Sequence, residues 1–260
     1  MYDFPWTTDA NDVLWSAIAT RLNGVGLAAP TSLTRGVDPL DLWSSPQLVF
    51  GQTCGYPYVT SLHRSVTLVA TPIYDFPGCV GAANCSFLIA SKKSGRWSLA
   101  NFRGARAVVN NPDSNSGMNR FRAAVAPLAG GKAFFCEVTV SGSHAASIAA
   151  VAADEADIAS IDCVSLALIQ RGRPDMTDNV RVIAPTAVTQ GLPFIVSNAL
   201  APTYLQPLRA ALADVLADSS LAQARKTLGI VGAQVLDAAH YDDVAKLESE
   251  AIAAGYPDLL

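Results

Sequence analysis

The amino-acid sequence predicts an α/β protein built from two lobes. Apolar runs typical of strands alternate with stretches at helical spacing through most of the 260 residues, which favours α/β units with largely parallel sheets. That length suits one large domain or two lobes. Proline- and glycine-rich stretches at 71–81 and 184–193 interrupt the alternation. If the chain crosses between lobes at both stretches, residues 85–185 form an inserted second lobe, and residues 1–84 plus 186–260 form the first.

The first lobe begins with a predicted helix. Leu14, Ile18 and Leu22 recur at helical spacing, with N-capping side chains at 7–9 and a glycine stop at 23–24. Strands are expected at 47–50, at 66–70 and, after the inserted lobe, at 194–196. The tail from Tyr204 is rich in helix formers and is expected to be mostly helical.

The inserted lobe alternates strands and helices most regularly. Its expected strands are 86–90, 106–110, 133–140, 157–162 and 180–183. Its expected helices are 118–125, 143–153 and 164–170. The polar loops that follow the strands of such units come to the carboxyl edge of the sheet, where ligands bind.

Composition and charge exclude several classes of protein. Hydrophobic residues make up 50% of the chain and charged residues 15%, so a sizeable core is assured and disorder is excluded. The 22 acidic and 18 basic residues leave a net charge of −4, without any dense basic run. We therefore expect no nucleic-acid partner and no binding to an anionic membrane surface.

No direct membrane insertion is expected either. The longest uncharged stretch, 182–208, is long enough to cross a bilayer, but it is interrupted by Pro185, Pro193, Pro202 and Pro207. Residues 1–6 have neither the basic start nor the apolar run of a signal peptide. We expect a periplasmic protein if a signal peptide has been removed, and a cytoplasmic one otherwise.

The five cysteines show no metal-binding pattern. The sequence has no CxxC pair and no Cys/His cluster at zinc spacing, so we expect no metal and no cofactor. Cys79 and Cys85 are close enough in sequence to bridge across a loop, and Cys54 offers a further partner. We favour the interpretation that the cysteines are small buried hydrophobes.

Polar side chains gather at three predicted strand ends. The small polar residues of Asp-Ser-Asn-Ser-Gly, 113–117, can cap the following helix and leave its first N–H groups pointing outward, which suits an anion. An ordinary capping loop is the alternative. Ser-Gly-Ser-His, 141–144, repeats the arrangement, with His144 in the first turn of the next helix. Asp162 ends the following strand at its carboxyl edge.

These segments resemble the phosphate-, phosphite- and phosphonate-binding proteins of ABC importers. Four segments appear in the family's order: 113–117, 141–147, 156–162 and 191–194. The segment Phe-Gly-Gln-Thr-Cys-Gly-Tyr-Pro-Tyr-Val, 50–59, resembles the family's glycine-rich, tyrosine-containing segment. The resemblance covers about residues 47–197. It implies a two-lobed type II periplasmic-binding-protein fold with a ligand cleft between the lobes.

The resemblance also implies a function and roles for individual residues. The protein would be a solute-binding protein, not an enzyme, that captures a small oxyanion for the membrane subunits of an ABC importer. The oxyanion oxygens would be bound by Ser114, Asn115 and Ser116. The remaining walls would be lined by Tyr56 or Tyr58, His144 and Asp162. The family's first strand normally precedes the position of Tyr2, so we expect a truncated or short start, with Tyr2 reaching the ligand.

A carboxylate at Asp162 predicts selectivity among anions. It accepts a hydrogen bond from a protonated ligand oxygen or from an ammonium group. That favours a protonated phosphite, phosphate or phosphonate, or an amino-phosphonate, over sulfate. The alternative is that Asp162 only caps the next helix, which is expected to begin near Val164.

Other functions remain open from the sequence. Ser116, His144 and Asp162 contain the residue types of a hydrolase triad, but not in the α/β-hydrolase order, and no GxSxG elbow occurs. A cytosolic enzyme or a sensor on the same two-lobed fold would also bind a small metabolite. The missing signal peptide favours the enzyme, whereas the lack of a nucleophile or metal cluster speaks against it.

Overall fold

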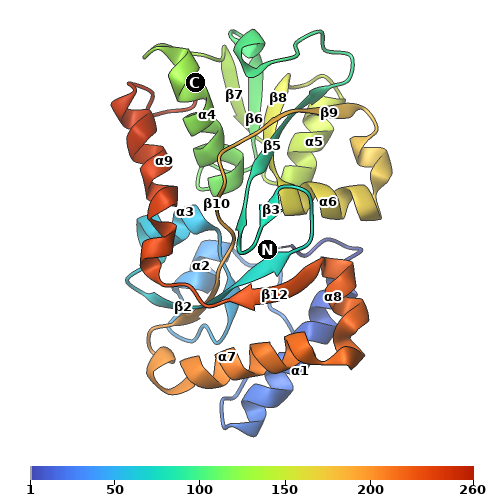
Figure 1. Ribbon diagram of the computed structural model, residues 1–260, viewed down its shortest axis with the longest axis vertical. Coiled ribbons are helices and arrows are strands. Elements are labelled where there is room, and N and C mark those ends of the chain that lie inside the picture. Colours follow the sequence, from blue (N-terminus) through green and yellow to red (C-terminus); the bar gives the residue numbers. More distant parts are fainter. Residues whose placement is uncertain (1) are drawn as a thin grey trace. The chain divides into compact units, whose positions relative to one another are not determined.

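The computed structural model describes residues 2–260, which pack as two compact units (Figure 1). Unit 1 comprises residues 2–75 and Gly191–His240, and unit 2 comprises Phe76–Gln190 and Tyr241–Leu260. Each unit has its own sheet and its own hydrophobic core.

The C-terminal segment Tyr241–Leu260 belongs to unit 2. Helix α9 (Asp242–Ala253) lies alongside α4 (Arg120–Ala129) in Figure 1 and buries Val244 and Ala251. The chain therefore passes between the units a third time, at 240–241, whereas two passages are predicted from the sequence, with all of 186–260 in the first lobe. The division into a lobe of residues 1–84 plus 186–260 and an inserted lobe of residues 85–185, which would move relative to each other, stays a prediction.

The sheet of unit 1 has the order β1–β11–β2–β12, and all its pairings are antiparallel. Its strands are β1 (Gly51–Gln52), β2 (Val66–Tyr74), β11 (Phe194–Ser197) and β12 (Ile230–Gln234). The expectation of largely parallel sheets is wrong here, because the chain leaves the unit after β2 and returns through β11 in the opposite direction. Strand β12 lies in the tail that was expected to be mostly helical.

The helices of unit 1 pack on this sheet and on each other. Its longer helices are α1 (Thr8–Gly24), α7 (Ala201–Ala217) and α8 (Ala222–Leu228). The predicted face of α1, with Leu14, Ile18 and Leu22, is buried in the core of the unit. Shorter segments are α2 (Pro39–Ser44), α3 (Gly55–Pro57), a π-helical turn (Tyr58–Leu62) and the 3₁₀ turn Ser219–Leu221. A further 3₁₀ turn, Ala238–Tyr241, spans the passage from unit 1 to unit 2.

Unit 2 contains a mixed five-stranded sheet with the order β7–β6–β8–β5–β9. Its strands are β5 (Ser86–Ser91), β6 (Arg106–Val109), β7 (Glu137–Val140), β8 (Ile158–Asp162) and β9 (Val180–Pro185). Strand β6 runs parallel to β7 and β8, while β5 is antiparallel to β8 and β9. A small antiparallel sheet joins β10 (Thr189–Gln190), β4 (Ala83–Asn84) and β3 (Cys79–Val80).

Helices connect the parallel strands of unit 2, as the sequence predicts. A π-helical turn (Asn115–Asn119) leads into α4 after β6, α5 (His144–Ala152) follows β7, and α6 (Cys163–Gly172) follows β8. Two 3₁₀ turns complete the unit, Leu99–Phe102 and Pro174–Thr177. None of the helices within residues 2–260 is long and apolar enough to cross a membrane.

Candidate functional site

Three strand-to-helix junctions of unit 2 meet at the carboxyl ends of the parallel strands. The hydroxyl oxygen of Ser116, after β6, lies 2.9 Å from Nε2 of His144, in the first turn after β7. The hydroxyl of Ser160, on β8, donates a 2.6 Å hydrogen bond to the carbonyl oxygen of Ser116. The junctions that carry five of the predicted site residues are therefore in direct contact, at the edge where open α/β sheets bind ligands.

Ser114 and Ser116 form the turn that begins the helix after β6. Ser114 is the N-cap residue, and its hydroxyl oxygen accepts a 2.9 Å hydrogen bond from the N–H of Gly117. The two serine hydroxyl oxygens are 3.3 Å apart, and both side chains are buried. The first N–H groups of a helix have no acceptor within it, so this turn is suited to an anion.

Asn115 lies in the same turn but bonds into the interior of unit 2. Its side-chain amide donates to the hydroxyl of Thr189 over 3.2 Å, and its Oδ1 accepts from Asn119 over 3.0 Å. Those two contacts hold the amide in place, so the backbone N–H is the group of Asn115 that suits an anion. Its predicted contact with the ligand stays a prediction.

Gly117 is required by the close approach of Asn110, the residue after β6. A Cβ atom added at Gly117 would overlap Oδ1 of Asn110. That oxygen is buried and has no hydrogen-bond partner among the described residues. The glycine of the predicted Asp-Ser-Asn-Ser-Gly segment thus lets the turn pack directly against the end of β6.

His144 is neutral at physiological pH in this environment. Burial lowers its pKa to about 4, opposed by the negative charge of Asp162 and assisted by the positive charge of Arg120. A neutral imidazole has one N–H, so either Ser116 donates to Nε2 and the proton sits on Nδ1, or Nε2 donates to Ser116. Nδ1 is buried and has no hydrogen-bond partner within the described chain.

Asp162 caps helix α6, as the alternative interpretation of this residue predicts. Its Oδ1 accepts a 2.8 Å hydrogen bond from the N–H of Ser165, and its Oδ2 accepts a 3.5 Å bond from Nδ2 of Asn84. The side chain is 2% exposed. Each carboxylate oxygen has further lone pairs, so capping and a ligand contact are compatible, and the ligand role stays a prediction.

Arg120 is a buried cation that is not among the site residues predicted from the sequence. It is 1% exposed, and its guanidinium donates to the hydroxyl of Thr189 over 2.7 Å and to Oδ1 of Asn84 over 2.7 Å. Within residues 2–260 it forms no ion pair. Asn84 also donates to Asp162, so it connects the buried positive charge of Arg120 to one of the three junctions. Its sequence signal is an arginine beside Phe121 in a helix that is apolar except for Arg120 and Arg122.

The three predicted tyrosines lie in unit 1. Tyr56 and Tyr58 are buried in the α3 segment and the turn that follows it. Burial, and then the negative charge of Asp237, raise the pKa of Tyr58, so its hydroxyl keeps its proton. Tyr2 packs edge-on against Tyr74, with ring centroids 5.3 Å apart. Their predicted contacts with the ligand stay predictions.

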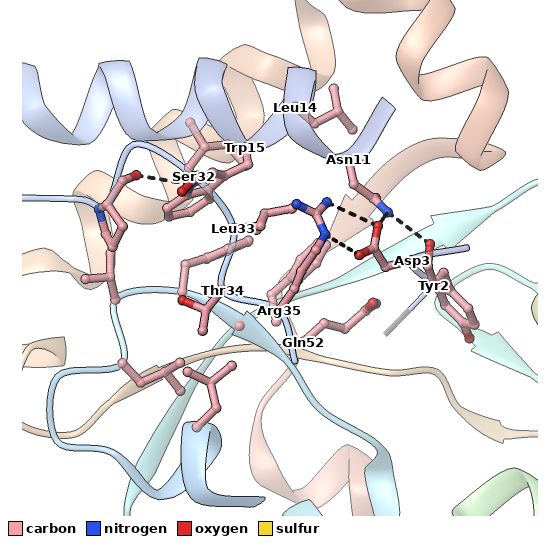
Figure 2. Close-up of a pocket in the computed structure, with 18 of the residues that line it drawn as sticks. Tyr2, Asp3, Asn11, Leu14, Trp15, Ser32, Leu33, Thr34, Arg35 and Gln52 are labelled. Atoms are coloured by element: carbon pink, nitrogen blue, oxygen red, sulfur yellow. Dashed lines mark hydrogen bonds and ion pairs between the residues drawn. The ribbon is translucent and has the colours of Figure 1, made fainter. Parts of the chain in front are cut away.

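Tyr2 also lines a cavity of about 540 Å³ within unit 1. Figure 2 shows its largely apolar wall, including Leu14 and Trp15, and the polar group at its rim. There Arg35 pairs with Asp3 over 2.6 Å, and Asn11 donates to the same carboxylate over 3.0 Å. This cavity is not predicted from the sequence, because the segment 30–43, which supplies part of its wall and includes most of α2, carries no recognisable motif.

The cysteines and acidic residues give no metal centre in the described part of the chain. No group of three or more His, Cys, Asp or Glu side chains there is arranged to hold a metal ion. All five cysteines are thiols rather than half-cystines: Cys54, Cys85 and Cys163 are buried, Cys79 is half-buried, and Cys136 is exposed. The interpretation as buried hydrophobes therefore fails for Cys136, and the suggested Cys79–Cys85 bridge is not formed.

Comparison with known proteins places these features in a family context. Residues 47–241 match the family model described as the periplasmic substrate-binding protein of ABC phosphonate transporters. No curated protein sequence matches the chain.

Solved structures resemble the chain over most of its length. A binding-protein component of an ABC phosphonate transporter from Pseudomonas aeruginosa has a TM-score of 0.75 at 16% identity, covering 95% of this chain and 83% of that one. PhnD1 from Prochlorococcus marinus, in complex with methylphosphonate, has a TM-score of 0.75 at 13% identity, covering 93% of both chains. A Xanthomonas citri protein bound to ATP has a TM-score of 0.67 at 17% identity, covering 93% and 92%. At these identities the likeness establishes the two-lobed periplasmic-binding-protein fold alone, which confirms the predicted fold class.

Proposed function

Because the chain belongs to the family of periplasmic substrate-binding proteins of ABC phosphonate transporters, we propose that the three strand ends of unit 2 supply its oxyanion-binding groups. The family consists of transport proteins rather than enzymes, and its members bind their substrate for an ABC transporter. The choice among phosphonate, phosphite and phosphate, the residues that bind it and the membrane subunits that receive it are parts of the proposal.

The contact between Ser116 and His144 carries this proposal. When Ser116 donates to Nε2, the N–H at Nδ1 of His144 is not used within the pair; when Nε2 donates instead, the O–H of Ser116 is not used within it. The pair therefore keeps one hydrogen-bond donor in either proton arrangement. The N–H groups at the start of the helix after β6 add donors of the same kind. Oriented dipoles of this sort solvate an oxyanion without an ion pair.

The charges behind the strand ends support a partly protonated ligand. Arg120 provides a buried positive charge without a carboxylate partner, which favours an anion near it. Asp162 provides a carboxylate acceptor near the same groups and repels a fully ionised anion. Together they favour a ligand with both an anionic oxygen and a P–OH or ammonium donor, such as a phosphonate or an amino-phosphonate.

A panel of ligands tests the proposal. Thermal-shift and calorimetric titrations use methylphosphonate, 2-aminoethylphosphonate, phosphite, phosphate, sulfate and ATP. A ligand at about 100 times its dissociation constant stabilises the protein by roughly 2.7 kcal/mol, which such measurements detect readily. We expect phosphorus oxyanions to bind more tightly than sulfate, and the Ser116→Ala variant to bind phosphorus oxyanions more weakly than the natural protein does. Tight binding of ATP alone would contradict the proposed ligand class.

A further inference from the structure

Three of the five cysteines meet around Gly78 in unit 2. A Cβ atom built at Gly78 would lie 2.9 Å from Cβ of Cys163 and 3.0 Å from Sγ of Cys85. The next residue, Cys79, places its Sγ 3.6 Å from Sγ of Cys163, although the two residues are 84 positions apart in sequence. The fold therefore brings the thiols of β3 and of the first residue of α6 into direct contact.

The geometry selects Cys163, rather than Cys85, as the partner of Cys79. Cys79 and Asn84 are paired in register across the β3–β4 hairpin, and the N–H of Cys85 bonds to the carbonyl oxygen of Gly78 over 3.0 Å. Within the described residues, the sulfur–sulfur contact of Cys79 is with Cys163, and none is formed with Cys85. A disulfide requires the two sulfur atoms to close to about 2.05 Å, a displacement small enough for side-chain rotation to supply much of it.

The two thiols differ in solvent exposure and in acidity. Cys79 is half-buried, so a small oxidant can reach it, whereas Cys163 is 1% exposed. The hydrogen bond with Cys163 lowers the pKa of Cys79, while the same contact, together with burial, raises the pKa of Cys163. Since the thiolate is the nucleophile, Cys79 is the thiol that attacks first.

We propose that Cys79 and Cys163 are a disulfide-forming pair that is oxidised by small-molecule disulfides. The Cys79 thiolate attacks one sulfur of the oxidant RSSR, forms a mixed disulfide and releases RS⁻, which takes up a proton. The Cys163 thiol loses its proton and attacks the Cys79 sulfur, which forms the internal disulfide and releases the second RS⁻. The second RS⁻ is protonated in turn, so the protein loses two protons and two electrons, and RSSR is reduced to two RSH.

The bond would join two elements that lie beside Asp162. Cys163 follows Asp162, the N-cap of α6, and β3 pairs with β4, whose Asn84 donates to the same carboxylate. The disulfide would therefore fix the start of α6 to the β3–β4 hairpin. This inference does not depend on which ligand the protein binds.

Thiol counting in a glutathione redox buffer tests the pair. Cys136 is exposed and would form a mixed disulfide, so the experiments use the full chain with Cys136→Ser, which leaves four of the five cysteines. We expect the free thiols of the denatured protein to fall from four to two on oxidation, without bound glutathione. Non-reducing peptide mapping should join the peptides of Cys79 and Cys163, and the midpoint of thermal unfolding should rise by roughly 5–15 °C.

Two further variants of the Cys136→Ser protein show which cysteine is the partner of Cys79. Cys85→Ser should still form the bridge and show the same rise in unfolding temperature. Cys163→Ala should form only a mixed disulfide with glutathione at Cys79, without the rise. Four free thiols after equilibration with oxidised glutathione, or a bridge from Cys79 to Cys85, would overturn the proposal. The peptide map is also made on the protein that keeps both Cys79 and Cys163. A variant that fails to fold therefore leaves the test intact.

Discussion

Ser116 and His144 lie on different strand-to-helix junctions, yet the hydroxyl oxygen of one is 2.9 Å from Nε2 of the other. Their separation of 28 residues spans one helix and one strand, α4 and β7. The contact exists because β6 and β7 run parallel and neighbour each other, which brings their carboxyl ends to one edge. It joins two polar segments that are separate in the sequence into one group of hydrogen-bond donors.

Ser116→Ala should weaken binding of a phosphorus oxyanion by about 1–3 kcal/mol, or roughly 5- to 150-fold in dissociation constant, because the buried anion loses a donor. Calorimetric titration with methylphosphonate measures the effect. Ser249→Ala is the matched control and should leave affinity unchanged, because Ser249 is an exposed position in α9 whose hydroxyl donates to the carbonyl oxygen of Lys246. Equal affinities of all three proteins would remove Ser116 from the site.

Because of His144, the free energy of unfolding should fall as the pH falls from about 6.5 to about 4. Its folded pKa is about 4 and its unfolded value is 6.5, so between these pH values the unfolded chain binds a proton that the folded protein does not. The free energy of unfolding therefore rises with pH through this range, by about 2–3 kcal/mol in total, and does not change further above it.

His144→Gln provides the comparison, because glutamine does not titrate. Urea unfolding of both proteins without ligand, between about pH 4.5 and 7.5, gives the difference in slope, in which the titration of other groups cancels. The natural protein should lose more stability than the variant on acidification. Parallel pH profiles would show that the imidazole keeps an ordinary pKa.

Gly117→Ala should destabilise unit 2 by about 1–3 kcal/mol, since the added methyl group overlaps Oδ1 of Asn110. Denaturant unfolding measures the change. Adding Asn110→Ala should remove the overlap and recover at least half of the loss, which a double-mutant cycle reports as a coupling energy. A cost below about 0.5 kcal/mol for the single variant would mean that Asn110 moves aside freely.

Local patterns predict the parts of the fold that depend on local contacts. The junctions after β6, β7 and β8 were predicted because small polar residues follow each apolar strand, and Ser114, Ser143 and Asp162 do cap the helices that follow. The buried face of α1 was predicted from its spacing in the same way.

Features that depend on distant partners were not predicted. Strand β12 forms in a helix-rich tail because it pairs with β2, more than 150 residues earlier in the chain. Arg120 is buried because Asn84 and Thr189, 36 and 69 residues away, supply its acceptors. Neither partner is visible in a local window of sequence, so a charged residue in a helix is read as solvent-exposed.

Asp162→Asn should change selectivity more than stability. Asparagine keeps the size of the side chain and is an equally good N-cap, so the bond from the N–H of Ser165 is retained. The long 3.5 Å bond that Oδ2 accepts from Nδ2 of Asn84 is lost. The substitution removes the negative charge and the acceptor for a P–OH or ammonium group. We expect it to weaken binding of 2-aminoethylphosphonate by about 1.5–3 kcal/mol, the range for a hydrogen bond to a charged group, while sulfate binding holds or improves.

Asp162→Ala separates the two roles of this carboxylate. It removes both the cap and the charge, so it should lower the free energy of unfolding by about 1 kcal/mol relative to Asp162→Asn, with the same change in ligand preference. Titrating each protein with 2-aminoethylphosphonate and with sulfate, beside urea unfolding, measures both effects. If both ligands lose affinity equally in Asp162→Asn, the carboxylate serves only α6. If the preference shifts while the unfolding free energy of Asp162→Asn stays within about 0.5 kcal/mol of the natural protein, the charge itself discriminates among anions.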